Sequence, residues 1–102
     1  MNKKTFITKI FWIPETEGGR KSIPAIGNQM YLPFIDFENH EMIWSVYVVN
    51  YKMLDSYTSL AEVRYLNQKV APDDIFVGLK FNLREGNRKV ASGEVLSLKT
   101  DV

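Results

Sequence analysis

The fold of this chain is decided by the stretch Gly78-Leu79-Lys80-Phe81-Asn82-Leu83-Arg84-Glu85-Gly86-Asn87-Arg88-Lys89-Val90-Ala91-Ser92-Gly93-Glu94-Val95. Leu79, Phe81 and Leu83 alternate there with polar residues, which is the period of a strand with one buried face. Gly86-Asn87 follows, and this pair tolerates the positive φ angles that a two-residue hairpin turn needs. The stretch is therefore predicted to form two antiparallel strands joined by a tight turn.

The other apolar segments also alternate, or are rich in β-branched and aromatic residues, and none holds an i, i+3, i+4, i+7 stripe over three turns. The predicted strands are Thr5–Ile13, Met30–Phe37, Ile43–Asn50, Thr58–Leu66, Val77–Glu85 and Arg88–Leu98. The fourth could also form one or two helical turns, and we favour a strand. These strands predict an all-β fold, a small closed six-stranded antiparallel β-barrel, because closure removes exposed edges that promote aggregation.

Three details bear on this barrel. Proline has no N–H, so Pro33 inside the second predicted strand requires an edge or a bulge. Ala91-Ser92-Gly93 interrupts the apolar alternation of the last strand, and we expect a bend there. The connection 14–29 contains Gly18-Gly19 and Gly27 and is long for a compact domain, so we expect it to be either functional or mobile.

Size and composition limit the function. The chain has 102 residues, enough for one domain spanning 1–102 with a single modest core. Apolar residues make up 45% and charged residues 25%, as in ordinary folded proteins. The 13 basic and 12 acidic residues leave a net charge of +1, whereas dedicated nucleic-acid binders are usually more basic.

Cysteine and membrane signals are both missing from the sequence. Without cysteine there are no disulfides, thiolate metal sites or cysteine nucleophiles. Met1-Asn2-Lys3-Lys4 could begin a signal peptide, but Lys9 interrupts the apolar stretch and Pro14-Glu15 ends it without a cleavage site, which favours a first strand. No run approaches the ~20 apolar residues of a membrane helix. We therefore expect a cytoplasmic protein that does not bind a membrane.

The chain carries three motifs in order. The first is Glu17-Gly18-Gly19-Arg20 followed by Pro24, and the second is Tyr31-Leu32-Pro33-Phe34. The third consists of Phe81, Arg84-Glu85-Gly86, Arg88 and Val90. Together they resemble the C-terminal β-barrel domain of elongation factor Tu and related translational GTPases. The resemblance spans nearly the whole chain, although residues 38–66 match only in strand character. It implies a stand-alone copy of that barrel domain.

In that family the barrel helps to hold aminoacyl-tRNA and packs on the GTPase domain and on partner proteins. The resemblance implies binding roles for Arg20, Glu85 and Gly86. The cations beside them are further candidates for contact with RNA or a partner, namely Arg84, Arg88 and Lys89. The family's arginine in the second motif is Leu32 here, and the lysine that often precedes the later proline is Ala71. Because such changes remove phosphate contacts, we expect any RNA binding to be weak.

A phosphate-binding loop for GTP is not expected. Gly19-Arg20-Lys21-Ser22 is similar to the end of a Walker motif, but arginine replaces its lysine, and Pro14 stands where the first glycine belongs. The two glycines could form a nest of amides for an anion, and we favour a plain turn. We predict no GTP binding and no cofactor.

The sequence shows no pattern that indicates a catalytic site or a metal site. His40 is the single histidine and lies between two predicted strands, where we expect a solvated loop residue rather than a metal ligand. Asp73-Asp74 follows Pro72 in ordinary turn composition, and adjacent side chains point apart, so we assign no acid/base pair. A serine nucleophile would need a base, and His40 has no recognisable partner pattern. We predict no catalytic residues and no metal.

The first strand is apolar on both faces. Phe6, Ile10 and Trp12 share one parity, whereas Ile7 and Phe11 share the other. One parity must fill the barrel, and the other is either covered by loops or forms a contact surface. The candidates for an apolar partner surface are therefore Phe11 and Trp12, whichever points outward.

The sequence thus favours a non-enzymatic binding module. The first hypothesis is protein–protein interaction linked to translation factors, for example a mimic of the elongation factor Tu domain that engages a factor or toxin directed at translation. The alternative is a weak RNA-binding domain that uses the cations named above. An enzyme has no constellation of residues behind it, and the oligomeric state is not predicted.

Overall fold

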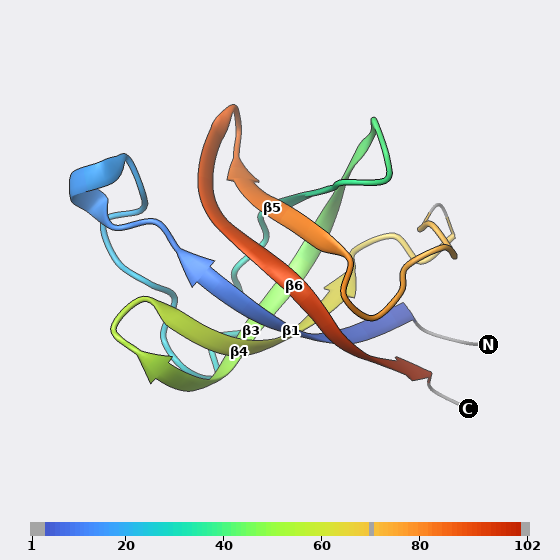
Figure 1. The fold of residues 1–102 in the computed structure, drawn as a ribbon, viewed down its shortest axis with the longest axis horizontal. Coiled ribbons are helices and arrows are strands. Elements are labelled where there is room, and N and C mark those ends of the chain that lie inside the picture. The colour runs from blue at the N-terminus through green and yellow to red at the C-terminus, as the bar shows by residue number, and fades with distance from the viewer. Residues whose placement is uncertain (1–3, 70, 101–102) are drawn as a thin grey trace.

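Six strands close into one antiparallel barrel (Figure 1), as the alternation predicts. The structure is a computed structural model that describes residues 4–69 and 71–100. The elements are β1 Lys4–Trp12, the short 3-10 turn η1 Glu15–Glu17, β2 Phe34–Phe37, β3 Ile43–Asp55, β4 Thr58–Tyr65, β5 Lys80–Glu85 and β6 Arg88–Thr100. Around the barrel the strands follow the order β1-β4-β3-β2-β5-β6, and β6 pairs with β1 to close it.

The uncertain fourth strand is confirmed as a strand. Along β4 every second residue is buried, from Ser59 to Tyr65, as expected where successive side chains point to opposite faces. The strand also pairs on both edges, with β1 and with β3, which a helix could not do.

Three predicted boundaries differ from the structure by three residues or more, and the others by two at most. The third strand continues past the predicted Asn50 to Asp55. The second strand begins at Phe34 rather than Met30, because Pro33 has no N–H with which to continue the ladder. The fifth begins at Lys80 rather than Val77, because Gly78 adopts a φ of 95° in a turn.

Aromatic rings fill the barrel interior. Phe37 lies among them, with ring centroids 6.0 Å from Phe6, 6.1 Å from Phe81 and 6.5 Å from Tyr65. The ring of Phe81 also explains the predicted interruption in the last strand. A Cβ atom on Gly93 would lie 2.4 Å from the Phe81 ring, so only glycine fits there.

Buried polar side chains hold the long connection against one end of the barrel. The indole Nε1 of Trp12 donates to Ser59 Oγ at 2.8 Å, and that hydroxyl donates to Asn50 Oδ1 at 2.8 Å. The Asn50 amide then donates to the backbone oxygen of Pro24 at 2.9 Å. Because the polar side chains of Trp12, Ser59 and Asn50 satisfy one another, this chain of bonds fixes the connection without leaving them unpaired. Figure 1 shows this connection and the β3–β4 turn on the same side of the barrel.

Candidate functional site

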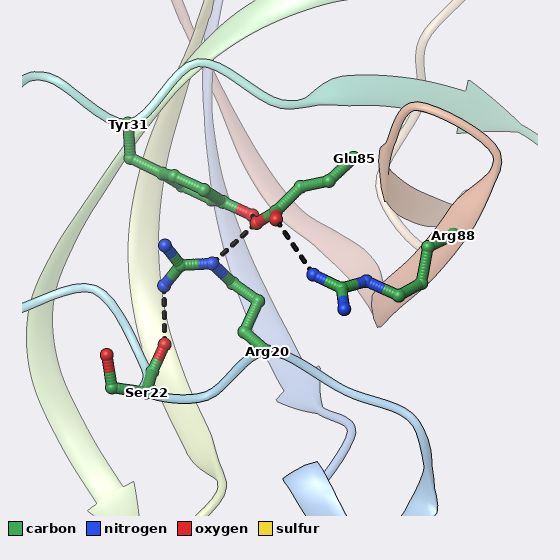
Figure 2. Close-up of polar contacts among 5 residues, drawn as sticks. All are labelled: Arg20, Ser22, Tyr31, Glu85 and Arg88. Carbon is green, nitrogen blue, oxygen red and sulfur yellow. Dashed lines mark hydrogen bonds and ion pairs between the residues drawn. The ribbon is translucent and has the colours of Figure 1, made fainter.

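Three of the residues predicted from the sequence, Arg20, Glu85 and Arg88, meet at the end of β5 (Figure 2). Arg20 Nε donates to Glu85 Oε2 at 2.5 Å, and the Tyr31 hydroxyl donates to the same oxygen at 2.7 Å. Arg88 contacts the other oxygen at 3.3 Å. Arg20 also lies over the Tyr31 ring, 4.6 Å from its centroid, and donates to the backbone oxygen of Ser22. The cluster ties the long connection to the β5–β6 hairpin.

The two glycines before Arg20 set its position. Gly18 has a φ of 95° and its N–H donates to Glu15 O at 3.1 Å. The Gly19 N–H donates to Pro14 O at 3.0 Å, and a Cβ atom on Gly19 would lie 1.7 Å from the oxygen of Ile13. These amides are therefore occupied by a plain turn, as predicted, and they are not free to bind an anion.

The electrostatics of the cluster favour an ionised Glu85. Partial burial by itself raises the pKa of Glu85, but the hydrogen bonds from Tyr31 and Arg20 and the charge of Arg20 hold that pKa below its usual value. Burial, followed by the hydrogen bond to Glu85, raises the pKa of Tyr31. The tyrosine therefore stays a neutral donor to a charged acceptor, which is a strong form of hydrogen bond.

The remaining hairpin candidates lie apart from this cluster. Arg84 points to the outside of the barrel and contacts Asp36 Oδ2 through Nε at 3.2 Å and Nη2 at 3.1 Å. Gly86 forms the hairpin turn with a φ of 62°. Lys89 is exposed and lines an open groove of about 400 Å³ that crosses β1, β5 and β6 and also contains Phe11.

The structure separates the two aromatic candidates of β1. Trp12 is only 3% exposed and packs in the core with its ring 5.9 Å from that of Tyr31, so it cannot form a partner surface. Phe11 points outward and is 43% exposed, with Lys9 Nζ 5.5 Å from its ring centroid. Of this pair, only Phe11 is available to a partner.

A larger apolar surface lies along β3, where the sequence did not indicate a site. The Val48 N–H donates to Tyr31 O and the Val46 N–H to Pro33 O, each at 3.1 Å, so the segment before β2 continues alongside β3. This register turns alternate residues outward. We define the outer β3 face by the outward side chains of Met30, Leu32, Phe34, Ile43, Tyr47, Val49 and Tyr51.

Charged side chains border the outer β3 face on the β4 side. Arg64 lies directly opposite Tyr47 in the ladder, with its guanidinium carbon 5.4 Å from the tyrosine ring centroid. Glu62, the next outward residue of β4, pairs with Lys99 Nζ at 3.6 Å. The three charged residues Arg64, Glu62 and Lys99 line an open groove of about 490 Å³ together with Ile7, Gln29, Val49 and Tyr51.

His40 lies in the loop before β3, as the sequence predicted, and is partly exposed, but it also has structural partners. Its Nε2 lies 2.6 Å from Asp74 Oδ1, and its ring meets the Trp44 ring edge-on with centroids 5.1 Å apart. The hydrogen bond from His40 lowers the pKa of Asp74. This pair therefore links the loop before β3 to the loop before β5. The two residues are far apart in the sequence, so the residues next to each of them could not indicate this contact.

Residues 4–69 and 71–100 contain neither a candidate metal site nor a helix that could cross a membrane. In this part of the chain no group of three or more His, Asp or Glu residues is arranged to hold a metal ion. It also includes no helix of the length and hydropathy that a membrane crossing needs.

Comparison with known proteins assigns no family. No model of a known protein family matches the chain, and a search of curated proteins finds no match. The roles of the candidate residues therefore follow only from their positions and contacts in the structure. Arg20 and Glu85 form a structural latch between the long connection and the β5–β6 hairpin, and the outer β3 face gathers seven outward apolar side chains that have no evident role in the core.

Proposed function

We propose that this protein is a non-enzymatic, cytoplasmic binding module that recognises a protein partner through the outside of its barrel. The observation that carries the proposal is the outer β3 face. Met30 is 81% exposed, Leu32 47% and Phe34 38%, and all three project from one side of the same segment. Contiguous exposed apolar surface of this kind marks interaction sites, whereas single exposed apolar residues are normal.

Folding does not explain these side chains. The barrel interior is already filled by residues of the opposite parity, among them Tyr31 and Ile35, which flank Leu32 and Phe34 in the sequence. An apolar side chain left in water gives up the stabilisation of roughly 1.5–3 kcal/mol that full burial would give. Methionine and aromatic residues are also enriched at protein interfaces. A partner that covers this face would recover that stabilisation.

The resemblance to the elongation factor Tu C-terminal domain supports a link with translation. The Gly-Gly-Arg and Arg-Glu-Gly motifs, which carry the resemblance, meet in the latch between Arg20 and Glu85. We propose that the chain is a stand-alone relative of that domain. Its partner would then be a protein that acts with or against a translation factor.

RNA binding is the weaker alternative. Arg20 and Arg88 both contact Glu85, and Arg84 contacts Asp36, so each of these three arginines already has an acidic partner. A phosphate would have to compete with these carboxylates. Contacts to phosphates supply much of the affinity for nucleic acid, and the three candidate arginines are the ones already paired.

The experiment that tests the proposal is affinity capture from source lysate with wild type, Met30→Glu and Val77→Glu, followed by identification of bound proteins and bound RNA. Val77 is 62% exposed in the loop before β5, so it provides a matched apolar-to-acid control away from the outer β3 face. We expect a defined protein that wild type and Val77→Glu retain and Met30→Glu loses. Recovery of RNA alone, or equal recovery of every protein by Met30→Glu, would contradict the proposal.

A further inference from the structure

The structure points to the chemistry of the partner, and this inference rests on the proposed function. We propose that the outer β3 face and the groove beside it bind a protein segment that carries apolar side chains next to a carboxylate. The apolar side chains would cover Met30 and Leu32. The carboxylate would pair with Arg64.

Register places the apolar and cationic parts side by side. Tyr47 lies opposite Arg64 on β4, and the pairing of Tyr31 with Val48 on its other side places Leu32 beside Tyr47. Leu32, Tyr47 and Arg64 therefore form one row across the outside of the barrel, about two strand spacings wide, or roughly 10 Å. A single extended segment of a partner can contact all three residues.

Arg64 has the properties of a carboxylate receptor. Among the described residues no carboxylate lies within ion-pair distance of it, whereas its neighbour Glu62 is already paired with Lys99 at 3.6 Å. Its guanidinium rests on the Tyr47 ring, which restricts the side chain before binding. Arginine presents a planar fork of donors that matches a carboxylate in two parallel hydrogen bonds.

The charge of the groove favours an acidic partner over a second copy of this chain. With Glu62 paired to Lys99, the groove keeps the positive charge of Arg64. A symmetric dimer through the same face would apply the same patch twice and bring two such cations toward one another. Like charges at an interface are unfavourable, and an acidic segment supplies the opposite charge.

Selection of random peptides displayed on phage against the full chain tests the inference. We expect the enriched peptides to combine apolar residues with an aspartate or glutamate. The affinity of one such synthetic peptide is then measured by fluorescence anisotropy against wild type, Arg64→Gln, Arg64→Lys, Met30→Ser and the control Lys21→Gln, which removes a charge from an exposed position of the long connection. Thermal melts of each variant verify that it is folded.

A charge-assisted bidentate pair predicts a loss of affinity on the order of tenfold for Arg64→Gln. Arg64→Lys keeps the charge without the fork and should lose less, and Lys21→Gln should bind as wild type does. Replacing the acidic residue of the peptide by its amide should cost as much as Arg64→Gln. Arg64→Gln combined with the amide peptide should lose little more affinity than either change alone, because the two groups form one interaction.

Several results would overturn the inference. Enriched peptides without acidic residues, or equal affinity for wild type and Arg64→Gln, would remove the carboxylate partner. Dimers in sedimentation that Met30→Glu dissociates would make a second copy the occupant of the face. Peptides whose binding depends on Phe11 and not on Met30 would refute this site while the protein-binding function stands. The absence of any enriched peptide and of any captured protein would refute both.

Discussion

Replacing the two neighbouring aromatics of β1 by serine gives a direct test of which face of this strand is internal. Trp12 and Phe11 are adjacent in sequence, yet one fills the barrel and the other lies outside it. We therefore expect Trp12→Ser to destabilise the protein far more than Phe11→Ser.

The magnitudes follow from burial. Trp12 is 3% exposed and its indole N–H is bonded to Ser59, so its loss falls in the range of roughly 3–5 kcal/mol that is typical of a large aromatic removed from a core. Phe11 is 43% exposed, and burying a whole phenylalanine is worth about 1.5–3 kcal/mol, so its partial loss should cost about 1 kcal/mol. In a domain of this size 1 kcal/mol corresponds to roughly 4–8 °C in Tm.

Thermal melts and urea titrations of both variants, with sedimentation beside them, measure the difference. We expect Phe11→Ser to melt within about 8 °C of wild type and Trp12→Ser to melt at least 12 °C lower, or to be unfolded at room temperature. Equal and severe losses in both variants would refute the assignment, because they would mean that both faces of β1 are internal.

Three further predictions concern the latch and the excluded ligands. Glu85→Gln should lower the free energy of unfolding at pH 7 by roughly 1–2 kcal/mol. The loss of stability measured in urea titrations should shrink below about pH 4.5, because a carboxylate with a lowered pKa stabilises the fold only while it is ionised. A loss that does not depend on pH would contradict this role. Calorimetry should detect no GTP or GDP binding, since the amides of Gly18 and Gly19 are already bonded, and a micromolar Kd would overturn that expectation. Any RNA binding should be weak, with a log–log salt slope of about −2 to −3 for three phosphate contacts, so nanomolar affinity that does not vary with salt would argue against backbone contacts.

The barrel is readable from the sequence because period-two alternation is a local signal. It predicts the strands and the hairpin around Gly86, and the paired edges of β4 confirm the strand that was in doubt. The second and fifth strands begin at Phe34 and Lys80, a few residues later than predicted. The backbone of Pro33 and of Gly78 sets these starts, and hydrophobicity does not show it.

The buried polar chain could not be predicted. Asn50 and Ser59 have relative exposures of 0%, although residues of these types usually lie on the surface. Their partners Trp12 and Pro24 are remote in sequence, and no local pattern shows that these groups satisfy one another. The parity of β1 depends on the same contacts, which is why alternation alone left it open.

The candidate site was predictable only in part. The resemblance named Arg20 and Glu85, and the structure brings these two side chains together at 2.5 Å. Their shared partner Tyr31 was missed, although it belongs to the second motif. The outer β3 face was missed because residues 30–35 are all apolar, so the segment offers no alternation that would tell the outward side chains from the inward ones.

An amide-proton NMR map of the protein with its captured partner or a selected peptide locates the binding surface residue by residue. If the outer β3 face binds the partner, shift changes will gather along residues 30–34, along the outward positions of β3 and at Arg64. Changes confined to the hairpin around Arg88 and Lys89, with residues 30–34 unaffected, would contradict this prediction and would favour the basic hairpin as the binding surface.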